Sequence, residues 1–310
     1  MSGGLKLGTR GSPLALFQAR LVRERMRRAS GTAPEIVIIR TAGDSDRTTP
    51  LEELGEVGIF TAAIDRALLA GEVDVAVHSL KDAPSSFQQG IALGAVLERE
   101  DPRDTFLPAR EGETLRTLPP GAVIATGSLR RRSLLLERRP DLETVELRGN
   151  MDRRIQKRNE PGIDGVILAE AAMVRLEQKI PREVIAIERM LPACCQGIIG
   201  ITVREGEEEL VSAISDAATM RRARAERSFL RVLDGGCRVP LAAHSSIDDT
   251  SGALLLEGLV ADRDGRSVVR RSDRTTGPPD ADSDQALGEN VARAILDDEE
   301  GAALLRAMRS

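Results

Sequence analysis

The chain has 310 residues, 41% of them hydrophobic, and a formal net charge of −5. This length allows two or three domains with full apolar cores, and the acidic balance argues against a nucleic-acid-binding protein. No apolar run is long enough for a transmembrane helix, and the N-terminus lacks the apolar segment of a signal peptide.

The cysteine and histidine contents argue against a metal protein. Three cysteines, two of them adjacent at Cys194 and Cys195, make neither a disulfide framework nor a Cys-x-x-Cys zinc site. His78 and His244 are the two histidines, too few for a His-ligated zinc cluster. We therefore expect a protein of the reducing cytoplasm without a bound metal.

The first hundred residues alternate between strand-like and helical segments. Ser12 is placed to cap a helix that begins at Pro13 and ends near Arg28. The polar, glycine-containing stretch 41–58 predicts a mobile loop. We expect strands at 5–9, 35–40 and 73–77 and a further helix at 59–70.

A second unit begins near Glu100 and a third near Met220. Within the second unit, strands at 123–126, 144–147 and 165–168 are each followed by a helix. Such units predict a mostly parallel sheet covered by helices, so the expected fold class is α/β. The third unit opens with an arginine-rich helix and continues with hairpin-like strands at 253–260 and 267–271 and a closing helix from Ser283.

Polar or basic residues stand at four of the expected strand–helix junctions. Ligands of α/β proteins bind at the carboxyl ends of strands, against the N–H groups of helix N-termini. Taken singly, each junction is explained by helix capping plus a solvated charge, and 130–132 is compatible with one exposed helical face. Four converging junctions favour a site for a ligand with several carboxylates or phosphates; they are 9–12, 78–82, 126–132 and 148–150.

Asp82 follows an apolar strand and stands beside Lys81. A carboxylate among cations can move protons and stabilise a developing positive charge, and the alternative is an ordinary salt bridge. A Ser-His-Asp triad built on His78 or His244 has no nucleophile-elbow motif to support it. The sequence has no P-loop and no Gly-x-Gly-x-x-Gly, so nothing points to a nucleotide.

Cys237 lies directly after Gly235 and Gly236 and before Arg238. The glycines leave the sulfur unshielded, and a neighbouring cation favours the reactive thiolate. A small buried cysteine is the commoner outcome for such a residue. The hypothesis of covalent attachment at Cys237 therefore depends on the rest of the chain.

Six segments, in order along the chain, resemble porphobilinogen deaminase, also called hydroxymethylbilane synthase. The six segments, each given with its first residue number, are TRGSPLAL (9), VHSLKDAP (77), REDPRD (99), GSLRR (127), LRGN (147) and GGCRVP (235). The resemblance spans nearly the whole chain. It implies two lobes like those of periplasmic binding proteins, at 1–98 with 193–216 and at 99–192, and a smaller α/β domain at 217–310 that bears the cysteine.

The resemblance implies a cytoplasmic transferase of tetrapyrrole biosynthesis, the route to haem and other porphyrins. A dipyrromethane cofactor, held by Cys237 through a thioether, acts as primer. Four porphobilinogens lose ammonia and are added head to tail, and hydrolysis releases the linear hydroxymethylbilane. Asp82 resembles the catalytic carboxylate that assists ammonia loss, stabilises cationic pyrrole species and takes up the ring proton. The family also implies a monomer that binds neither nucleic acid nor membranes.

The same resemblance assigns the carboxylate-binding residues. Each pyrrole carries an acetate and a propionate, so the growing chain is a polycarboxylate, which suits arginines at several strand ends. The residues that resemble cofactor ligands are Ser79, Lys81, Ser128, Arg130, Arg131 and Arg148. Those that resemble substrate ligands are Arg10, Ser12, Phe60, Arg154 and Arg175.

The chain departs from the family pattern at three positions. Glu53 and Val57 stand where the family has lysines, so two cationic contacts are missing. Cys195 stands before Gln196 where the family tends to have glycine. These departures have three alternative consequences: the cofactor is bound more weakly, the loop closes differently, or other arginines compensate for the missing lysines. We expect activity to survive, because Asp82, Cys237 and most of the arginines are present.

Two other classes of protein remain as alternatives. A non-catalytic, two-lobed solute receptor would account for the lobes, but the Gly-Gly-Cys segment of a third domain and the expected lack of a signal peptide argue against it. A nucleic-acid binder would use the basic clusters 221–224 and 130–132. The acidic net charge and an aromatic content of 2% disfavour that class.

Overall fold

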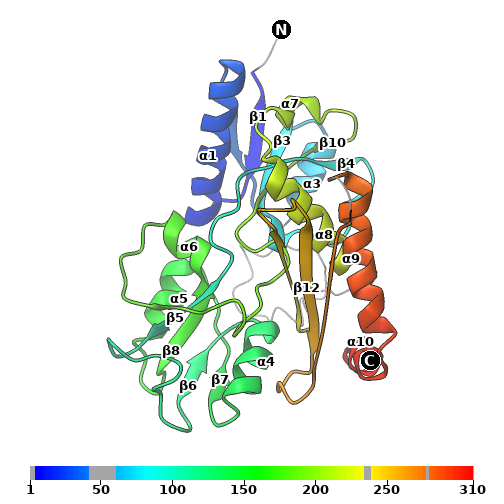
Figure 1. Ribbon diagram of the computed structural model, residues 1–310. Coiled ribbons are helices and arrows are strands. Elements are labelled where there is room, and N and C mark those ends of the chain that lie inside the picture. Colours follow the sequence, from blue (N-terminus) through cyan, green and yellow to red (C-terminus); the bar gives the residue numbers. More distant parts are fainter. Residues whose placement is uncertain (1–3, 42–60, 234–238, 277–278, 310) are drawn as a thin grey trace. The chain divides into compact units, whose positions relative to one another are not determined.

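The computed structural model describes residues 4–41, 61–233, 239–276 and 279–309 (Figure 1). The chain forms two compact units. Unit 1 comprises Met1–Glu100 and Gly197–Met220, and unit 2 comprises Asp101–Gln196 and Arg221–Ser310. No helix in these described ranges is both long and apolar enough to cross a membrane.

Unit 1 is built on a five-stranded sheet with the order β2-β1-β3-β10-β4. β1 (Lys6–Thr9) lies between β2 (Glu35–Ile38) and β3 (Val75–Ser79) and runs parallel to both. β10 (Ile199–Arg204) pairs antiparallel with both β3 and β4 (Ile91–Val96). β4 therefore runs in the same direction as β1, β2 and β3, and β10 is the one described strand of this sheet that runs in the opposite direction.

Helices cover both faces of this sheet. α1 (Pro13–Ser30) buries Ala19, Val22 and Met26 in one apolar cluster with the strands, and Val211 of α7 (Glu209–Ser212) joins it. α3 (Ala62–Leu69) contributes to a second cluster that includes Ala76 of β3. Alternate residues of β3 therefore point into different clusters, as the two-residue period of a strand requires.

The helix α1 begins where the sequence predicts it to begin. The Ser12 side chain accepts a hydrogen bond from the Ala15 N–H, and Pro13 occupies the first turn, where its missing N–H costs no helical bond. The helix ends at Gly31, whose φ of 79° lies in the left-handed region. The predicted cap at Ser12 is confirmed.

Unit 2 contains a second five-stranded sheet, with the order β7-β6-β8-β5-β9. β6 (Val123–Ala125) runs parallel to β7 (Glu143–Val145) and β8 (Gly165–Ala169). β5 (Asp104–Pro108) pairs antiparallel with β8 and β9 (Glu183–Val184). The helices that follow β6, β7 and β8 are α4 (Leu129–Arg138), α5 (Met151–Lys157) and α6 (Glu170–Arg175).

The C-terminal part of unit 2 is an antiparallel three-stranded sheet with helices. Its strands are β11 (Leu241–Ile247), β12 (Leu254–Ala261) and β13 (Val268–Arg274). α8 (Ala217–Leu233), which begins in unit 1, and α9 (Ala281–Leu296) pack on this sheet, and α10 (Glu299–Arg309) closes the chain.

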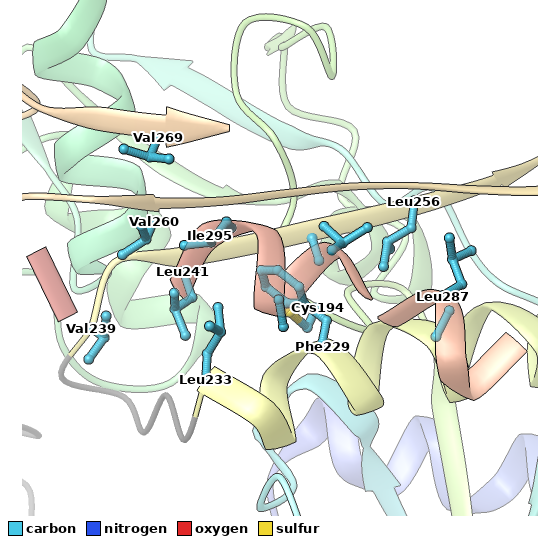
Figure 2. Close-up of a cluster of buried hydrophobic side chains, with 14 of the residues drawn as sticks. Cys194, Phe229, Leu233, Val239, Leu241, Leu256, Val260, Val269, Leu287 and Ile295 are labelled. Carbon is cyan, nitrogen blue, oxygen red and sulfur yellow. The ribbon is translucent and has the colours of Figure 1, made fainter. Parts of the chain in front are cut away.

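One apolar core holds this C-terminal part together. Figure 2 shows Phe229 and Leu233 of α8 and Leu287 and Ile295 of α9 gathered beneath the sheet. Val239 belongs to the same cluster. The chain therefore enters the segment 234–238 from this core at residue 233 and returns to the core at residue 239.

The predicted α/β class and the mostly parallel lobe sheets are confirmed, and five of the described strands were missed. The expected strand–helix pairs appear within a few residues of their predicted bounds. The sequence analysis did not identify β4, β5, β9, β10 or β11. The division into three domains remains a prediction, and the predicted loop at 41–58 lies almost entirely outside the described residues.

Candidate active site

In unit 1, predicted site residues follow two neighbouring parallel strands. β1 pairs with β3 through Leu7–Val75 and Gly8–Ala76, so the carboxyl ends of both strands meet at one edge of the sheet. Arg10 and Ser12 follow β1 at this edge. Ser79 ends β3, and Lys81 and Asp82 form the short 3₁₀ helix η1 (Leu80–Asp82) directly after it.

Hydrogen bonding fixes part of this edge and leaves Asp82 open to solvent. Gln18 Nε2 of α1 donates to Ser79 Oγ at 2.9 Å, which ties the first helix to the end of β3. The Ser12 hydroxyl is used as a helix cap. The Asp82 side chain is exposed and that of Lys81 is half-buried. An exposed carboxylate beside an ammonium group is suited to taking up and releasing protons.

His78 is a structural residue of β3. Its ring is buried, and Nε2 lies 3.1 Å from Thr202 Oγ1 of the adjacent strand β10. His244 lies in β11 of unit 2. This contact within the sheet explains why His78 is buried, so a role in a catalytic triad is not needed to explain it.

In unit 2, the loop after β6 approaches the end of β7 closely. A Cβ atom on Gly127 would lie 2.4 Å from the Leu147 carbonyl oxygen, so only glycine fits there. Ser128 follows as the cap of α4, its side chain accepting a hydrogen bond from the Arg131 N–H. The glycine thus brings the N-terminus of α4 next to the segment that carries Arg148.

Two of the other predicted arginines of unit 2, Arg148 and Arg154, lie near the end of β7. Arg148 pairs with Glu146, with Nε and Oε1 2.5 Å apart. Arg154 of α5 donates from Nε to the Gly149 carbonyl oxygen at 2.8 Å. Arg175 is buried at the end of α6. Backbone and ion-pair contacts therefore fix Arg148 and Arg154 beside the carboxyl ends of the parallel strands.

Arg130 and Arg131 are buried around one carboxylate, that of Asp104. Arg130 Nη1 lies 2.7 Å from Asp104 Oδ2, and Arg131 Nη2 lies 2.8 Å from Oδ1. Asp104 is 0% exposed and the arginines are 5% and 6% exposed. The interpretation of 130–132 as one exposed face is therefore wrong for Arg130 and Arg131. It holds for Arg132, whose partly exposed side chain pairs with Asp264.

Electrostatics fix the charge state of this group. Burial alone would raise the pKa of Asp104, but Arg130 and Arg131 outweigh burial and hold that pKa well below its usual range. One carboxylate and two guanidinium groups leave one net positive charge. Arg130 Nε is buried and has no hydrogen-bond partner among the described residues. A buried cationic group with an unused hydrogen-bond donor can bind a carboxylate, and a cofactor with several carboxylates would need such groups.

The two described cysteines are poor nucleophiles. Cys194 and Cys195 are free thiols, 8% and 2% exposed. Burial raises the pKa of the Cys194 thiol well above its usual range. Cys195 has a φ of 61°, the left-handed region that favours glycine. Cysteine therefore occupies a backbone conformation here that usually favours glycine.

Four residues singled out from the sequence lie outside the described residues. They are the predicted attachment residue Cys237, the predicted substrate contact Phe60, and Glu53 and Val57 of the polar loop.

Sequence analysis did not single out Asp104 and Gln196 as partners of the arginines. Gln196 Nε2 donates to Asp104 Oδ1 at 2.9 Å. Asp104 lies in a charged run and Gln196 is almost a hundred residues away, so neither position alone indicates a buried network. The one available signal is the apolar stretch after Asp104, which marks a strand whose first residue can be buried.

Family models match nearly the whole chain. The "Porphobilinogen deaminase, dipyromethane cofactor binding domain" matches residues 5–212, and the "Porphobilinogen deaminase, C-terminal domain" matches residues 220–297. The chain is 44% identical over 306 residues to a porphobilinogen deaminase of Rubrobacter xylanophilus, covering 98% of this chain and 96% of that protein. It is 42% identical over 301 residues to that of Syntrophotalea carbinolica, covering 95% and 93%.

These similarities place the chain in a class of transferases that build on a dipyrromethane cofactor. The chain belongs to the porphobilinogen deaminase family. Among solved structures it is similar to the methionine-binding protein MetQ, with a TM-score of 0.42 and 13% identity over 72% of this chain and 94% of that one.

Proposed function

We propose that this protein is a hydroxymethylbilane synthase that joins four porphobilinogens on a primer attached to Cys237. The observation that carries the proposal is the family match, which spans both the cofactor-binding and the C-terminal models. The buried arginine pair of unit 2, with its one net positive charge, supports it as a binding group for a pyrrole carboxylate.

Cys237 is the thiol we assign to the thioether. The chain has three cysteines, and the other two are buried. Leu233 and Val239, the described residues on either side of the segment 234–238, both belong to one buried apolar core. When bound, the dipyrromethane supplies the free pyrrole carbon to which the first substrate unit is joined.

The proposed binding residues divide into two sets. Ser79, Lys81, Ser128, Arg130, Arg131 and Arg148 would hold the acetate and propionate groups of the primer. Arg10, Ser12, Phe60, Arg154 and Arg175 would hold the incoming porphobilinogen and the growing chain. Bidentate arginine contacts orient planar carboxylates, so these residues also set the direction in which each unit is added.

Asp82 is the proposed proton-transfer residue. Each addition breaks the bond between the aminomethyl carbon and the amine of porphobilinogen, releases ammonia, and forms a carbon–carbon bond to the terminal pyrrole. That pyrrole must then lose a ring proton. The exposed Asp82 carboxylate can balance the positive charge of the reacting rings and accept the proton.

The proposal includes the cellular setting and the assembly of the protein. A biosynthetic enzyme in which Cys194 and Cys195 form no disulfide among the described residues fits a reducing cytoplasm. We further propose a monomer with three domains, 1–98 with 193–216, 99–192 and 217–310, that binds porphobilinogen and neither nucleic acid nor membranes.

Replacing Asp82 by asparagine tests the proposed chemistry. The amide is nearly isosteric but cannot accept the ring proton, so turnover should fall about 100-fold or more with the primer still attached. The measurement is ammonia release and bilane formation from porphobilinogen. Glu72→Gln is the control, because this exposed carboxylate precedes β3 at the opposite end of the strand. Wild-type turnover in Asp82→Asn would show that Asp82 is not the proton-transfer residue.

A further inference from the structure

A buried network surrounds the two arginines assigned to the primer. Asp104 accepts from Arg130 at Oδ2 and from Arg131 and Gln196 at Oδ1. Each guanidinium also has a backbone acceptor, Leu191 for Arg130 at 2.7 Å and Ile167 for Arg131 at 3.1 Å. Fixed acceptors therefore orient both guanidinium groups, while the buried Arg130 Nε has no hydrogen-bond partner among the described residues.

The network reaches the C-terminal domain through two adjacent backbone positions. Gln196 follows Cys195, whose N–H donates to Glu226 Oε2 of α8 at 2.5 Å. Glu226 is fully buried and accepts at Oε1 from the N–H and hydroxyl of Ser245 in β11. The helix that leads to the segment of Cys237 is thus hydrogen-bonded to the turn that carries Gln196.

Charge decides what Asp104 contributes. Two guanidinium groups held side by side without a counter-charge would repel each other in a buried setting. One carboxylate between them removes the repulsion and leaves one positive charge for a ligand carboxylate. We propose that Asp104 is a positioning residue that holds Arg130 and Arg131 in register to bind one carboxylate of the primer. This inference rests on the proposed function, in which Arg130 and Arg131 bind the primer, and it adds the residue that holds these two arginines in place.

The test uses full-length apo-protein and follows primer incorporation. Apo-protein is incubated with porphobilinogen well below its melting temperature, and the intact mass under denaturing conditions is recorded over time. In Asp104→Asn both arginines lose their charged acceptor, and one of them faces an NH₂ group in place of an oxygen. Incorporation should therefore be about tenfold slower than in wild type or worse. Incorporation in that variant at the wild-type rate overturns the proposal.

Asp284→Asn is the matched control, because it also breaks a buried ion pair in unit 2. Asp284 is 0% exposed and pairs with Arg221 at 3.2 Å, in the C-terminal domain and outside the arginine network. Both variants should melt at lower temperature than wild type, but Asp284→Asn should incorporate primer within about twofold of the wild-type rate. Equal slowing in both variants would assign the effect to general destabilisation and overturn the proposal.

Asp104→Glu covers the outcome that Asp104→Asn does not fold. It keeps the charge and moves the carboxylate by one methylene, so incorporation should be slower than in wild type and faster than in any folded Asp104→Asn protein. Wild-type incorporation in Asp104→Glu would show that the carboxylate position is immaterial and would overturn the proposal. If wild-type protein itself gains no primer mass, the proposed function fails, and that result is distinct from the failure of a variant alone.

Discussion

Asp65, a buried carboxyl group in the first turn of α3, links the stability of unit 1 to pH. Burial raises its pKa to about 6, against a hydrogen bond from Thr61 that lowers it, and its Oδ1 has no hydrogen-bond partner among the described residues. The folded state therefore keeps a proton that the unfolded state releases near pH 4. The stabilising contribution is full below that pH and is lost as the pH rises to 6.

An Asp65→Asn variant should escape this loss. Relative to wild type, its free energy of unfolding should rise by about 2 to 3 kcal/mol between pH 4 and pH 7. Urea unfolding at several pH values measures this difference and cancels the titration of the other carboxylates. A difference that does not change with pH would mean that Asp65 titrates alike in the folded and unfolded states.

Cys195 holds a backbone conformation that suits glycine. With φ at 61°, any side chain is strained, while the buried thiol still fills space. Cys195→Gly and Cys195→Ala both remove the thiol, but only glycine relieves the strain. Cys195→Gly should therefore be the more stable variant by about 1 kcal/mol, measured by thermal or chemical unfolding. Equal stability of the two variants would show that the left-handed conformation costs nothing here.

At the scale of the element, the N-terminus of α4 depends on the close approach of Gly127 to β7. In Gly127→Ala the new Cβ would meet the Leu147 carbonyl oxygen, so the loop or β7 must move. The expected cost is about 1 to 3 kcal/mol in unfolding free energy, with slower primer incorporation because Ser128 and Arg148 are separated.

Gly4→Ala is the control for this variant. No atom lies within 4 Å of the position of its added Cβ. Unfolding and incorporation should both remain as in wild type. If Gly127→Ala matched this control in both measurements, the junction would be able to relax without consequence.

Parallel strand–helix units and the hairpin strands β12 and β13 were predictable, and antiparallel strands that pair over long sequence distances were not. Ser12 with Pro13, and Ser128 before a helical run, mark helix starts directly because their side chains and ring satisfy local backbone needs. β5 and β10 have no helix directly after them and pair with strands far away in the sequence. Local patterns do not contain that pairing, so an apolar run of five or six residues is ambiguous.

The candidate site was predictable in its residue types and less so in its contacts. The motifs locate Arg130 and Arg131, but a helical run of arginines reads equally well as a solvated face. Only the fold brings Asp104 and Gln196 to these arginines and buries all four side chains. Burial of a charge depends on distant partners, which is why sequence reasoning predicted the two arginines as ligands but did not predict their buried contacts with Asp104 and Gln196.

At the scale of the whole molecule, the account depends on a covalent primer. The family match covers both the cofactor-binding and C-terminal models, and the arginine network is intact. Holo-protein should therefore turn over porphobilinogen despite Glu53 and Val57. Purified holo-protein that forms no bilane would contradict this expectation.

The most direct measurement is the intact mass of the denatured protein, before and after incubation with porphobilinogen, beside the Cys237→Ser variant. The account predicts an added mass of two linked pyrrole units on the wild-type chain and none that survives denaturation on Cys237→Ser. A wild-type chain that stays unmodified after incubation, or a variant that carries the same added mass, would contradict attachment of the primer to Cys237.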